Sequence, residues 1–248
     1  MPLNISGSVI NSAIASTLNY KSIVARGLVF AIDAASQDSY PQTGNIWYDT
    51  TSNCNTFTLA NGPVYYADNG GYFRFDGTND CGGTTANASN IVTTYTSDAW
   101  FRLQGNALNG FHVIFQKEGG ISGNAVYGLR SRDPGAGTSC MFGEISYCNT
   151  AGVTFNIWSK TLACTNCWYY VATTLDSSYC WRIYVNGVEE CSTTLTCYPY
   201  QNSSQLLLGT GDGRYTNGDI AAVRTYNRTL SAAEIAQNFN AQKSRFGY

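Results

Sequence analysis

The spacing of hydrophobic residues divides the chain into an N-terminal arm, residues 1–26, and a longer β-rich region, residues 27–248. In the arm, Ile10, Ile14 and Leu18 recur every four residues among polar neighbours, which predicts an amphipathic helix. A helix this short is unstable alone, so its apolar stripe must pack either on the rest of the chain or on a partner subunit. The residues that we assign to docking on a partner are Leu3, Ile5, Ile10, Ile14 and Leu18.

From residue 27 onward, short apolar or alternating runs are separated by turn residues, a pattern that predicts β-strands. Phe73 and Phe75, for example, alternate with more polar residues before a turn at Asp76-Gly77. About a dozen strands and one helix indicate an all-β, antiparallel two-sheet sandwich in a single domain. The predicted strands are 28–32, 72–76, 99–103, 111–116, 126–130, 141–147, 154–159, 168–175, 182–185, 188–191, 206–209 and 220–226.

A short helix is predicted at the C-terminal end. Ser231 and Glu234 have the spacing of a capping box, in which each side chain accepts a hydrogen bond from the backbone of the other residue. Leu230 and Ile235 flank this cap and can form a hydrophobic staple over it. The helix is expected to follow the last strand after a short polar turn and to end near Gly247.

The chain contains nine cysteines, a high and odd number. The Asn186-Gly187 pair predicts a two-residue hairpin that places Arg182 opposite Cys191 and leaves Cys180 diagonal to it, so no Cys180–Cys191 disulfide is expected. Cys164-Thr-Asn-Cys167 has zinc or redox spacing, but no second cysteine or histidine pair completes such a site. Buried thiols with one or two disulfides are therefore the favoured interpretation.

Several sequence segments resemble one known family. They are "GLVFAIDAA" from Gly27, "YPQTGNIWYDTTSN" from Tyr40, "GGYFRFDGTND" from Gly70, "RIYVNG" from Arg182 and "NGDIAAVRTYNRTLSAAEIAQNF" from Asn217. Together they resemble the concanavalin A-like lectin/glucanase superfamily, in its laminin-G and pentraxin-like jelly-roll branch. The combination is most similar to versions found in virion structural proteins of tailed phages, particularly cyanophages.

Composition and charge exclude several function classes. Charged residues make up only 12% of the chain and the formal net charge is −2, so the electrostatic footprint of a nucleic-acid-binding protein is missing. No apolar stretch approaches the roughly 20 residues that span a bilayer. The N-terminus does not have the pattern of a secretory signal peptide. We therefore expect no nucleic-acid or membrane partner and synthesis in a cytoplasm. The resemblance to phage virion proteins implies assembly in a host cytoplasm and a final location on the virion surface.

Catalysis is not expected. The glucanases of the wider superfamily resemble one another in a Glu-x-Asp-x-Glu strand, and the chain has no such triplet. Glu144 stands alone, and Glu189 and Glu190 are adjacent, so they should point to opposite faces of a strand. His112, the only histidine, is expected at a solvent-facing strand position.

Two binding sites remain as expectations. The resemblance implies a loop-borne calcium site, and the chain has oxygen ligands for such a site. No cofactor is expected to be required, and calcium is the one metal considered. Its ligands would be Asp76, Asn79, Asp80 and Asp219. Carbohydrate binding would use exposed aromatic rings, although such residues also build cores and interfaces. Its candidates are Trp47, Tyr48, Tyr198, Tyr200 and Tyr215.

These observations favour a non-enzymatic virion structural protein, a capsid decoration or cement protein docked through its N-terminal arm. Its expected partners are a major capsid or tail protein and further copies of itself, with a trimer suggested by analogy. The alternative is a lectin-like carbohydrate-binding module of a tail fibre or adhesion protein, which would bind surface glycans.

Overall fold

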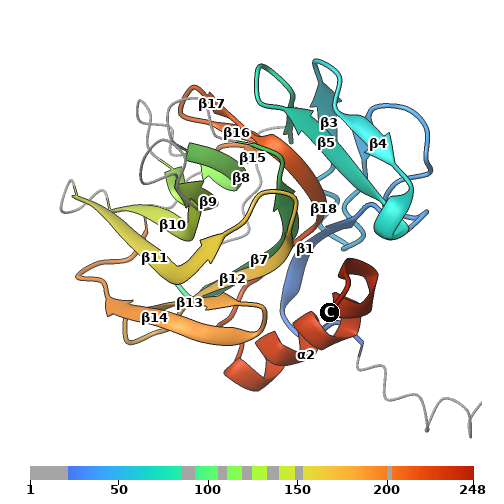
Figure 1. The fold of residues 1–248 in the computed structure, drawn as a ribbon. Coiled ribbons are helices and arrows are strands. Elements are labelled where there is room, and N and C mark those ends of the chain that lie inside the picture. Colours follow the sequence, from blue (N-terminus) through green and yellow to red (C-terminus); the bar gives the residue numbers. More distant parts are fainter. Residues whose placement is uncertain are drawn as a thin grey trace, which may run out of the picture.

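The fold is a sandwich of two antiparallel sheets with a helix on one outer face (Figure 1). The computed structural model describes residues 22–84, 93–105, 111–118, 125–132, 140–148, 153–199 and 203–248. The predicted arm helix and the five docking candidates, Leu3, Ile5, Ile10, Ile14 and Leu18, lie outside these residues. The all-β, jelly-roll prediction is confirmed.

Sheet A has eight strands in the order β14-β13-β12-β7-β18-β5-β4, with β1 also paired to β18. Because β18 pairs with three different strands, the end of the chain is held at the centre of the sheet. The strands of sheet A are β1 (Leu28–Asp33), β4 (Val64–Tyr66), β5 (Tyr72–Asp76), β7 (Tyr95–Leu103), β12 (Trp168–Leu175), β13 (Cys180–Val185), β14 (Val188–Thr194) and β18 (Asn217–Tyr226).

Sheet B also has eight strands, in the order β11-β10-β9-β8-β15-β6-β3-β2. Four consecutive strands, β8 to β11, form one half of it as an antiparallel meander. The strands of sheet B are β2 (Ile46–Trp47), β3 (Phe57–Ala60), β6 (Cys81–Gly83), β8 (Phe111–Glu118), β9 (Ala125–Arg132), β10 (Cys140–Cys148), β11 (Val153–Ala163) and β15 (Leu206–Leu208). A small hairpin follows β15, made of β16 (Thr210–Gly211) and β17 (Arg214–Tyr215).

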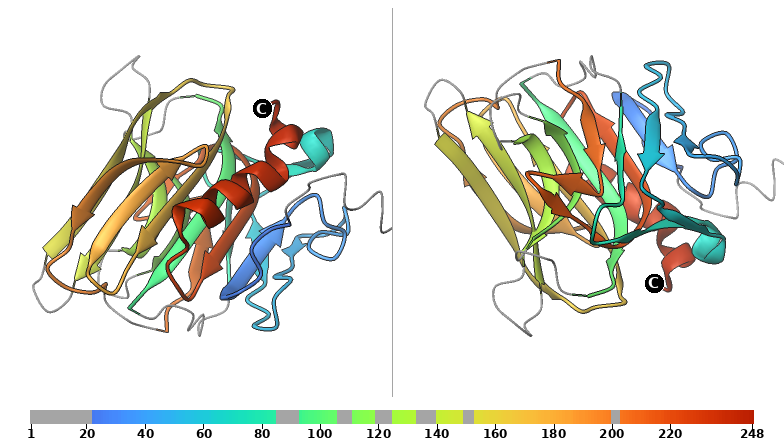
Figure 2. Two further views of the ribbon diagram at one scale, coloured as in Figure 1. Left: turned by 90° about the horizontal axis from the view of Figure 1, so that it is seen from below. Right: turned by 90° about the horizontal axis from the view of Figure 1, so that it is seen from above.

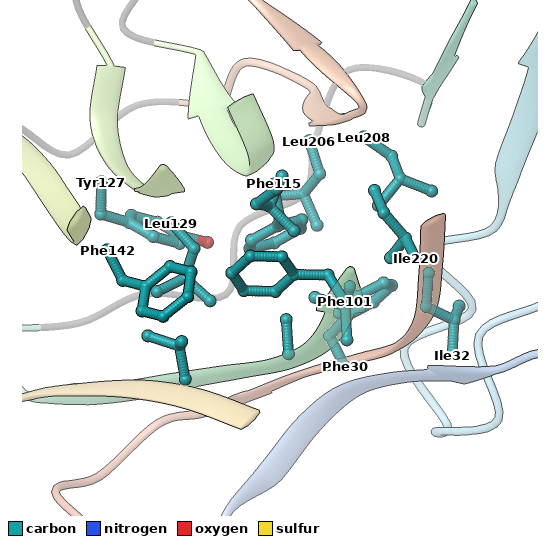
Figure 3. Close-up of a cluster of buried hydrophobic side chains, with 14 of the residues drawn as sticks. Phe30, Ile32, Phe101, Phe115, Tyr127, Leu129, Phe142, Leu206, Leu208 and Ile220 are labelled. Carbon is teal, nitrogen blue, oxygen red and sulfur yellow. The ribbon is translucent and has the colours of Figure 1, made fainter. Parts of the chain in front are cut away.

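The main hydrophobic core lies between the two sheets (Figure 3). Aromatic side chains fill much of it; Phe30 of sheet A stacks on Phe115 of sheet B with ring centroids 5.7 Å apart. The alternation predicted for β5 is also present, since Phe73 and Phe75 both point into this core. Aromatic burial of this extent dominates the energetics of a sandwich interior.

The C-terminal helix α2 (Ala232–Gln242) lies across the outer face of sheet A (Figure 2). Its capping box is present: the Glu234 N–H donates to Ser231 Oγ, and the Ser231 N–H donates to Glu234 Oε2 at 2.9 Å. Leu230 and Ile235 are both buried in the cluster beneath the helix. The short η3 helix (Lys243–Phe246) follows, and Gly247 closes it in a left-handed conformation, as the sequence predicts.

All twelve predicted strands are present, and six of them extend two or three residues further than predicted. The prediction missed the short strands β2, β3, β4 and β6 and the β16–β17 hairpin, because two- to four-residue strands leave little periodicity to read. The Asn186-Gly187 turn has positive φ at both residues, as expected of a type I′ hairpin. Its register differs from the prediction, since a bulge at Glu190 places Ile183, not Arg182, opposite Cys191.

Candidate functional site

The outer face of sheet A is closed by a buried polar network under α2. Arg224 on β18 donates to Asp98 on β7 at 2.7 Å, and both side chains are almost fully buried. Tyr170 and Asn238 donate to the other oxygen of Asp98, at 3.0 and 3.1 Å. Burial and the neighbouring carboxylate raise the pKa of Tyr170 well above its ordinary value, so it stays protonated and donates. This network fixes the helix to the sheet, and Arg224 also lines a small pocket between β1 and the Ser36–Asp38 turn.

The last residues of the N-terminal arm belong to the same layer. Val24 is only 8% exposed, and its backbone N–H donates to Asn238 Oδ1 at 2.9 Å. Gln237 of α2 donates to the Ser22 carbonyl at 2.7 Å, and Arg228 donates to the Arg26 carbonyl at 2.9 Å. The segment from Ser22 to Arg26 is therefore packed on the sandwich itself.

The outer face of sheet B is different. Within the described residues no helix or second sheet packs on it, and only the β16–β17 hairpin lies against part of β8 (Figure 1). Asp212 and Gly213 form the turn of this hairpin, both with positive φ. Gly211 fits tightly against Gln116, because a Cβ at Gly211 would lie 2.2 Å from the Gln116 amide. The hairpin therefore brings Asp212 and Arg214 over strands β8 and β9.

Two aromatic rings form a platform on this open face. Phe111 of β8 and Trp158 of β11 are both partly exposed, with ring centroids 6.2 Å apart and an interplanar angle of 43°. Trp158 stands opposite Gly143 of β10, and its indole covers that glycine. A Cβ at Gly143 would meet the indole at 2.3 Å, so only glycine lets the ring lie flat on the sheet.

Three arginines surround the platform. Arg132 is exposed, and its guanidinium carbon lies 6.0 Å from the Phe111 centroid and 5.9 Å from that of Trp158. Arg214 lies 4.9 Å from the Phe111 centroid. Arg130, only 4% exposed, pairs with Asp212 and donates to Gln116 Oε1 at 2.7 Å. The five residues Phe111, Arg130, Arg132, Trp158 and Arg214 are called the sheet B platform below.

The structure does not gather the aromatic residues proposed from sequence for carbohydrate binding. Trp47 is 0% exposed and packs against Phe73 in the core, so its assignment as a surface platform is wrong. Tyr48 is 43% exposed beside it, and Tyr198 is half-buried against Tyr179, far along the chain from both. Tyr215 lies on β17, next to Arg214 of the platform, and Tyr200 lies outside the described residues.

The four calcium-ligand candidates also separate. Asp219 is fully buried and its two oxygens accept from Arg74, Arg102 and Gln104, so two guanidinium groups already balance its charge. The remaining candidates, Asp76, Asn79 and Asp80, stay together in the turn after β5. Asp76 Oδ1 accepts from the backbone N–H groups of residues 78, 79 and 80, and these bonds lower the pKa of its carboxyl. In the described part of the chain, no three His, Cys, Asp or Glu side chains are grouped to hold a metal.

The acidic residues considered for catalysis have structural partners. Glu189 accepts from the Tyr184 hydroxyl at 3.2 Å, whereas Glu190 accepts from the backbone N–H groups of Lys160 and Thr161 at 2.7 and 2.8 Å. The two point in different directions, as their adjacency predicts, and Glu190 ties the β14 edge of sheet A to the β11 edge of sheet B. Glu144 lies on β10, but its side chain is outside the described part of the structure.

His112 is not solvent-facing as predicted. It is buried at 0% exposure, and its Nδ1 accepts from the Asn217 N–H at 3.2 Å. The hairpin after β15 and the start of β18 cover this end of β8, so a strand position that looks exposed in the sequence is enclosed.

The cysteine interpretation holds in part. Cys164 and Cys167 form a disulfide, so the pair does not hold a metal in this state, and Cys197 is also disulfide-bonded. Cys180 and Cys191 are free, as expected. Cys54 is free and exposed, so not every unpaired thiol is buried.

The platform residues were missed in the sequence although three of the four strands that carry them, β8, β9 and β11, were predicted. Phe111 stands directly opposite Arg132, and Gly143 stands between Arg130 and Trp158 in the next row across the sheet. A meander of consecutive hairpins over residues 111–163 would have suggested this juxtaposition. The exact registers depend on bulges in β8 and β11, which the sequence does not mark.

Comparison with known families agrees with the fold. The model of a laminin G-type family, described as the concanavalin A-like lectin/glucanases superfamily, matches residues 76–236. The chain belongs to this family. The match runs from the end of β5 to α2, so this laminin G-type region includes the whole sheet B platform. No curated protein sequence matches the chain significantly.

Solved structures with the same fold have little sequence identity to the chain. The binding domain of Paraclostridial mosquitocidal protein 1 has a TM-score of 0.67 at 14% identity, covering 87% of this chain and 52% of that one. The receptor-binding domain of botulinum neurotoxin type G has a TM-score of 0.63 at 14% identity, covering 87% and 51%. A Trypanosoma rangeli sialidase in complex with the inhibitor DANA has a TM-score of 0.63 at 13% identity, covering 96% and 39%. The chain thus spans about half the length of the binding domains, and the likeness establishes the lectin-like fold. Among the described residues, no helix is long and apolar enough to cross a membrane.

Proposed function

We propose that the chain is a non-enzymatic, lectin-like recognition module that binds glycans on the outer face of sheet B. The observation that carries the proposal is the contrast between the two outer faces. On sheet A, α2 and its buried network cover the surface except for a small pocket beside Arg224, whose described lining has no exposed aromatic ring. On sheet B, Phe111 and Trp158 present partly exposed rings beside guanidinium groups. Aromatic faces next to a few convergent polar groups are the usual elements of a site for an amphipathic small ligand.

Sugar rings suit this surface because they combine an apolar C–H face with a rim of hydroxyl groups. The flat indole of Trp158 offers an apolar contact, and the arginines offer N–H donors for hydroxyl oxygens. The same arrangement supports a binding role over a catalytic one. Of the carboxylates considered for hydrolysis, Glu189 and Glu190 are engaged in hydrogen bonds that hold the sheet edges.

The proposal is tested by a glycan array probed with the whole chain and with two aromatic variants. Trp158→Ala removes one of the two aromatic rings of the sheet B platform. It should weaken binding of the best-bound glycan about tenfold or more, as loss of a central aromatic contact does. Tyr48→Ala is the matched control, because Tyr48 is an exposed ring that directly follows β2, the edge strand of sheet B farthest from β11. Equal binding by Trp158→Ala and the unmodified chain would overturn this location, and loss of binding with Tyr48→Ala would point to the site suggested by the sequence.

A second role, virion decoration through the N-terminal arm, is proposed as the setting in which this module works. The observation that favours it is that hydrogen bonds to α2 hold the segment Ser22–Arg26 on the sandwich. Ser22, where this segment begins, therefore lies on the sheet A side, opposite the open face of sheet B. An arm that grips a capsid, tail protein or second copy from there would leave the platform facing outward.

The docking role is tested by deleting residues 1–21 and keeping Ser22–Arg26, which pack on the sandwich. The truncated chain should fold but no longer join purified particles, as measured by quantitative mass spectrometry of those particles. Unchanged incorporation would contradict the role of Leu3, Ile5, Ile10, Ile14 and Leu18 in docking.

A further inference from the structure

The sheet B platform carries an excess of positive charge in a chain that is negative overall. Arg130, Arg132 and Arg214 meet there, and the one acidic partner among the described residues is Asp212, which pairs with Arg130. No ion pair holds Arg132 or Arg214 within the described part of the chain. The chain as a whole has a formal net charge of −2, so this concentration of guanidinium groups is local.

Two buried donors in this cluster have no acceptor among the described residues. They are the Nε–H groups of Arg130 and Arg214. Arg130 is only 4% exposed, and a buried N–H without an acceptor costs free energy comparable to a lost hydrogen bond. Burial, and secondarily the charge of Arg214, lower the pKa of Arg130. Among the described residues, the cluster is therefore short of negative charge and of hydrogen-bond acceptors.

A carboxylate would supply both. Guanidinium groups bind planar carboxylates through paired N–H donors, and such charge-assisted bonds are about twice as strong as neutral ones. Arg132 and Arg214 both lie within 6.0 Å of the Phe111 centroid, so a carboxylate between them would sit at the edge of the aromatic platform. The ring bearing that carboxylate could then cover Phe111 and Trp158.

We propose that the sheet B platform selects acidic sugars, with Arg132 and Arg214 binding a sugar carboxylate while Phe111 and Trp158 contact the ring. This inference rests on the proposed glycan-binding function and adds the chemical class of the ligand. Arg130 and Asp212 support the subsite by fixing the β16–β17 hairpin, and with it Arg214, against β9.

The test is a glycan array that presents uronic-acid, sialic-acid, sulfated and neutral oligosaccharides to the whole chain. The best-bound carboxylated sugar is then titrated by calorimetry beside its methyl ester, which keeps the ring and removes the charge. Arg132→Gln keeps most of the side-chain stem but removes the guanidinium. It should weaken binding of the free acid about tenfold or more and leave binding of the ester unchanged.

Arg26→Gln is the matched control, since Arg26 is an exposed arginine on the opposite side of the sandwich, and it should change neither titration. Circular dichroism spectra of all variants establish that they are folded. Equal affinity for acid and ester, or insensitivity of the acid to Arg132→Gln, would overturn the carboxylate subsite while glycan binding stands. Preference for sulfated sugars alone would overturn the carboxylate assignment, and absence of binding to every sugar would overturn the proposed function as well.

Discussion

Replacing Asp98 by asparagine should destabilise the fold more than any surface substitution, because it leaves Arg224 charged and buried without a counter-ion. The two groups are 2.7 Å apart under α2, with 0% and 4% of their side chains exposed. Removing one member of a buried pair costs about 3–5 kcal/mol, whereas the whole unfolding free energy of a protein is about 5–15 kcal/mol. With a urea dependence of about 3 kcal/mol per molar, the unfolding midpoint should fall by about 1–1.7 M.

The assay is urea unfolding followed by tryptophan fluorescence. Asp38→Asn is the matched control, because Asp38 is an exposed acid in a turn, and its midpoint should shift by less than about 0.2 M. Replacing both partners, as Asp98→Leu with Arg224→Met, should recover part of the loss because no unpaired charge remains. A midpoint for Asp98→Asn within error of the Asp38→Asn control would refute the claim that this pair holds α2 to sheet A.

Three further predictions follow from the described contacts. The side-chain hydrogen bonds from Arg228 lower the pKa of Glu234 from 4.5 to about 2. The ionised Glu234 therefore contributes its full stabilisation above pH 4.5, and this stabilisation should be lost as the pH falls from 4.5 towards 2. Glu234→Gln should flatten acid unfolding curves in that window, and unchanged curves would contradict the Arg228 pairing. Gly143→Ala should displace the Trp158 indole and shift its fluorescence, and an unshifted spectrum would count against the flat ring. Chelation by EDTA should move the thermal midpoint by less than about 2 °C, because Asp219 is already neutralised by arginines; a larger drop restored by calcium would establish the site at Asp76, Asn79 and Asp80.

The sequence was sufficient for the elements whose signals are local. The capping box at Ser231 and Glu234, the type I′ turn at Asn186-Gly187 and the alternation of Phe73 and Phe75 depend on neighbouring residues, and all three were predicted correctly. Such features follow from backbone geometry and side-chain reach over a few residues. The fold class follows from their sum.

Burial and the candidate site could not be predicted in the same way. Trp47 and His112 are predicted from the sequence to be exposed, yet strands distant in sequence enclose both. The sheet B platform depends on the pairing of β8 with β9 and of β10 with β11, and on bulges that shift the registers by one or more residues. A one-residue slip moves a side chain to the other face, so residue types alone do not locate such a surface.

The most direct test of the account is a crystal structure of the whole chain with the best-bound glycan from the array. The account predicts a sugar ring lying against Phe111 and Trp158, with its acidic group at Arg132 and Arg214. A glycan bound instead at Tyr48, or at the turn containing Asp76 and Asp80, would contradict the assignment of recognition to the outer face of sheet B.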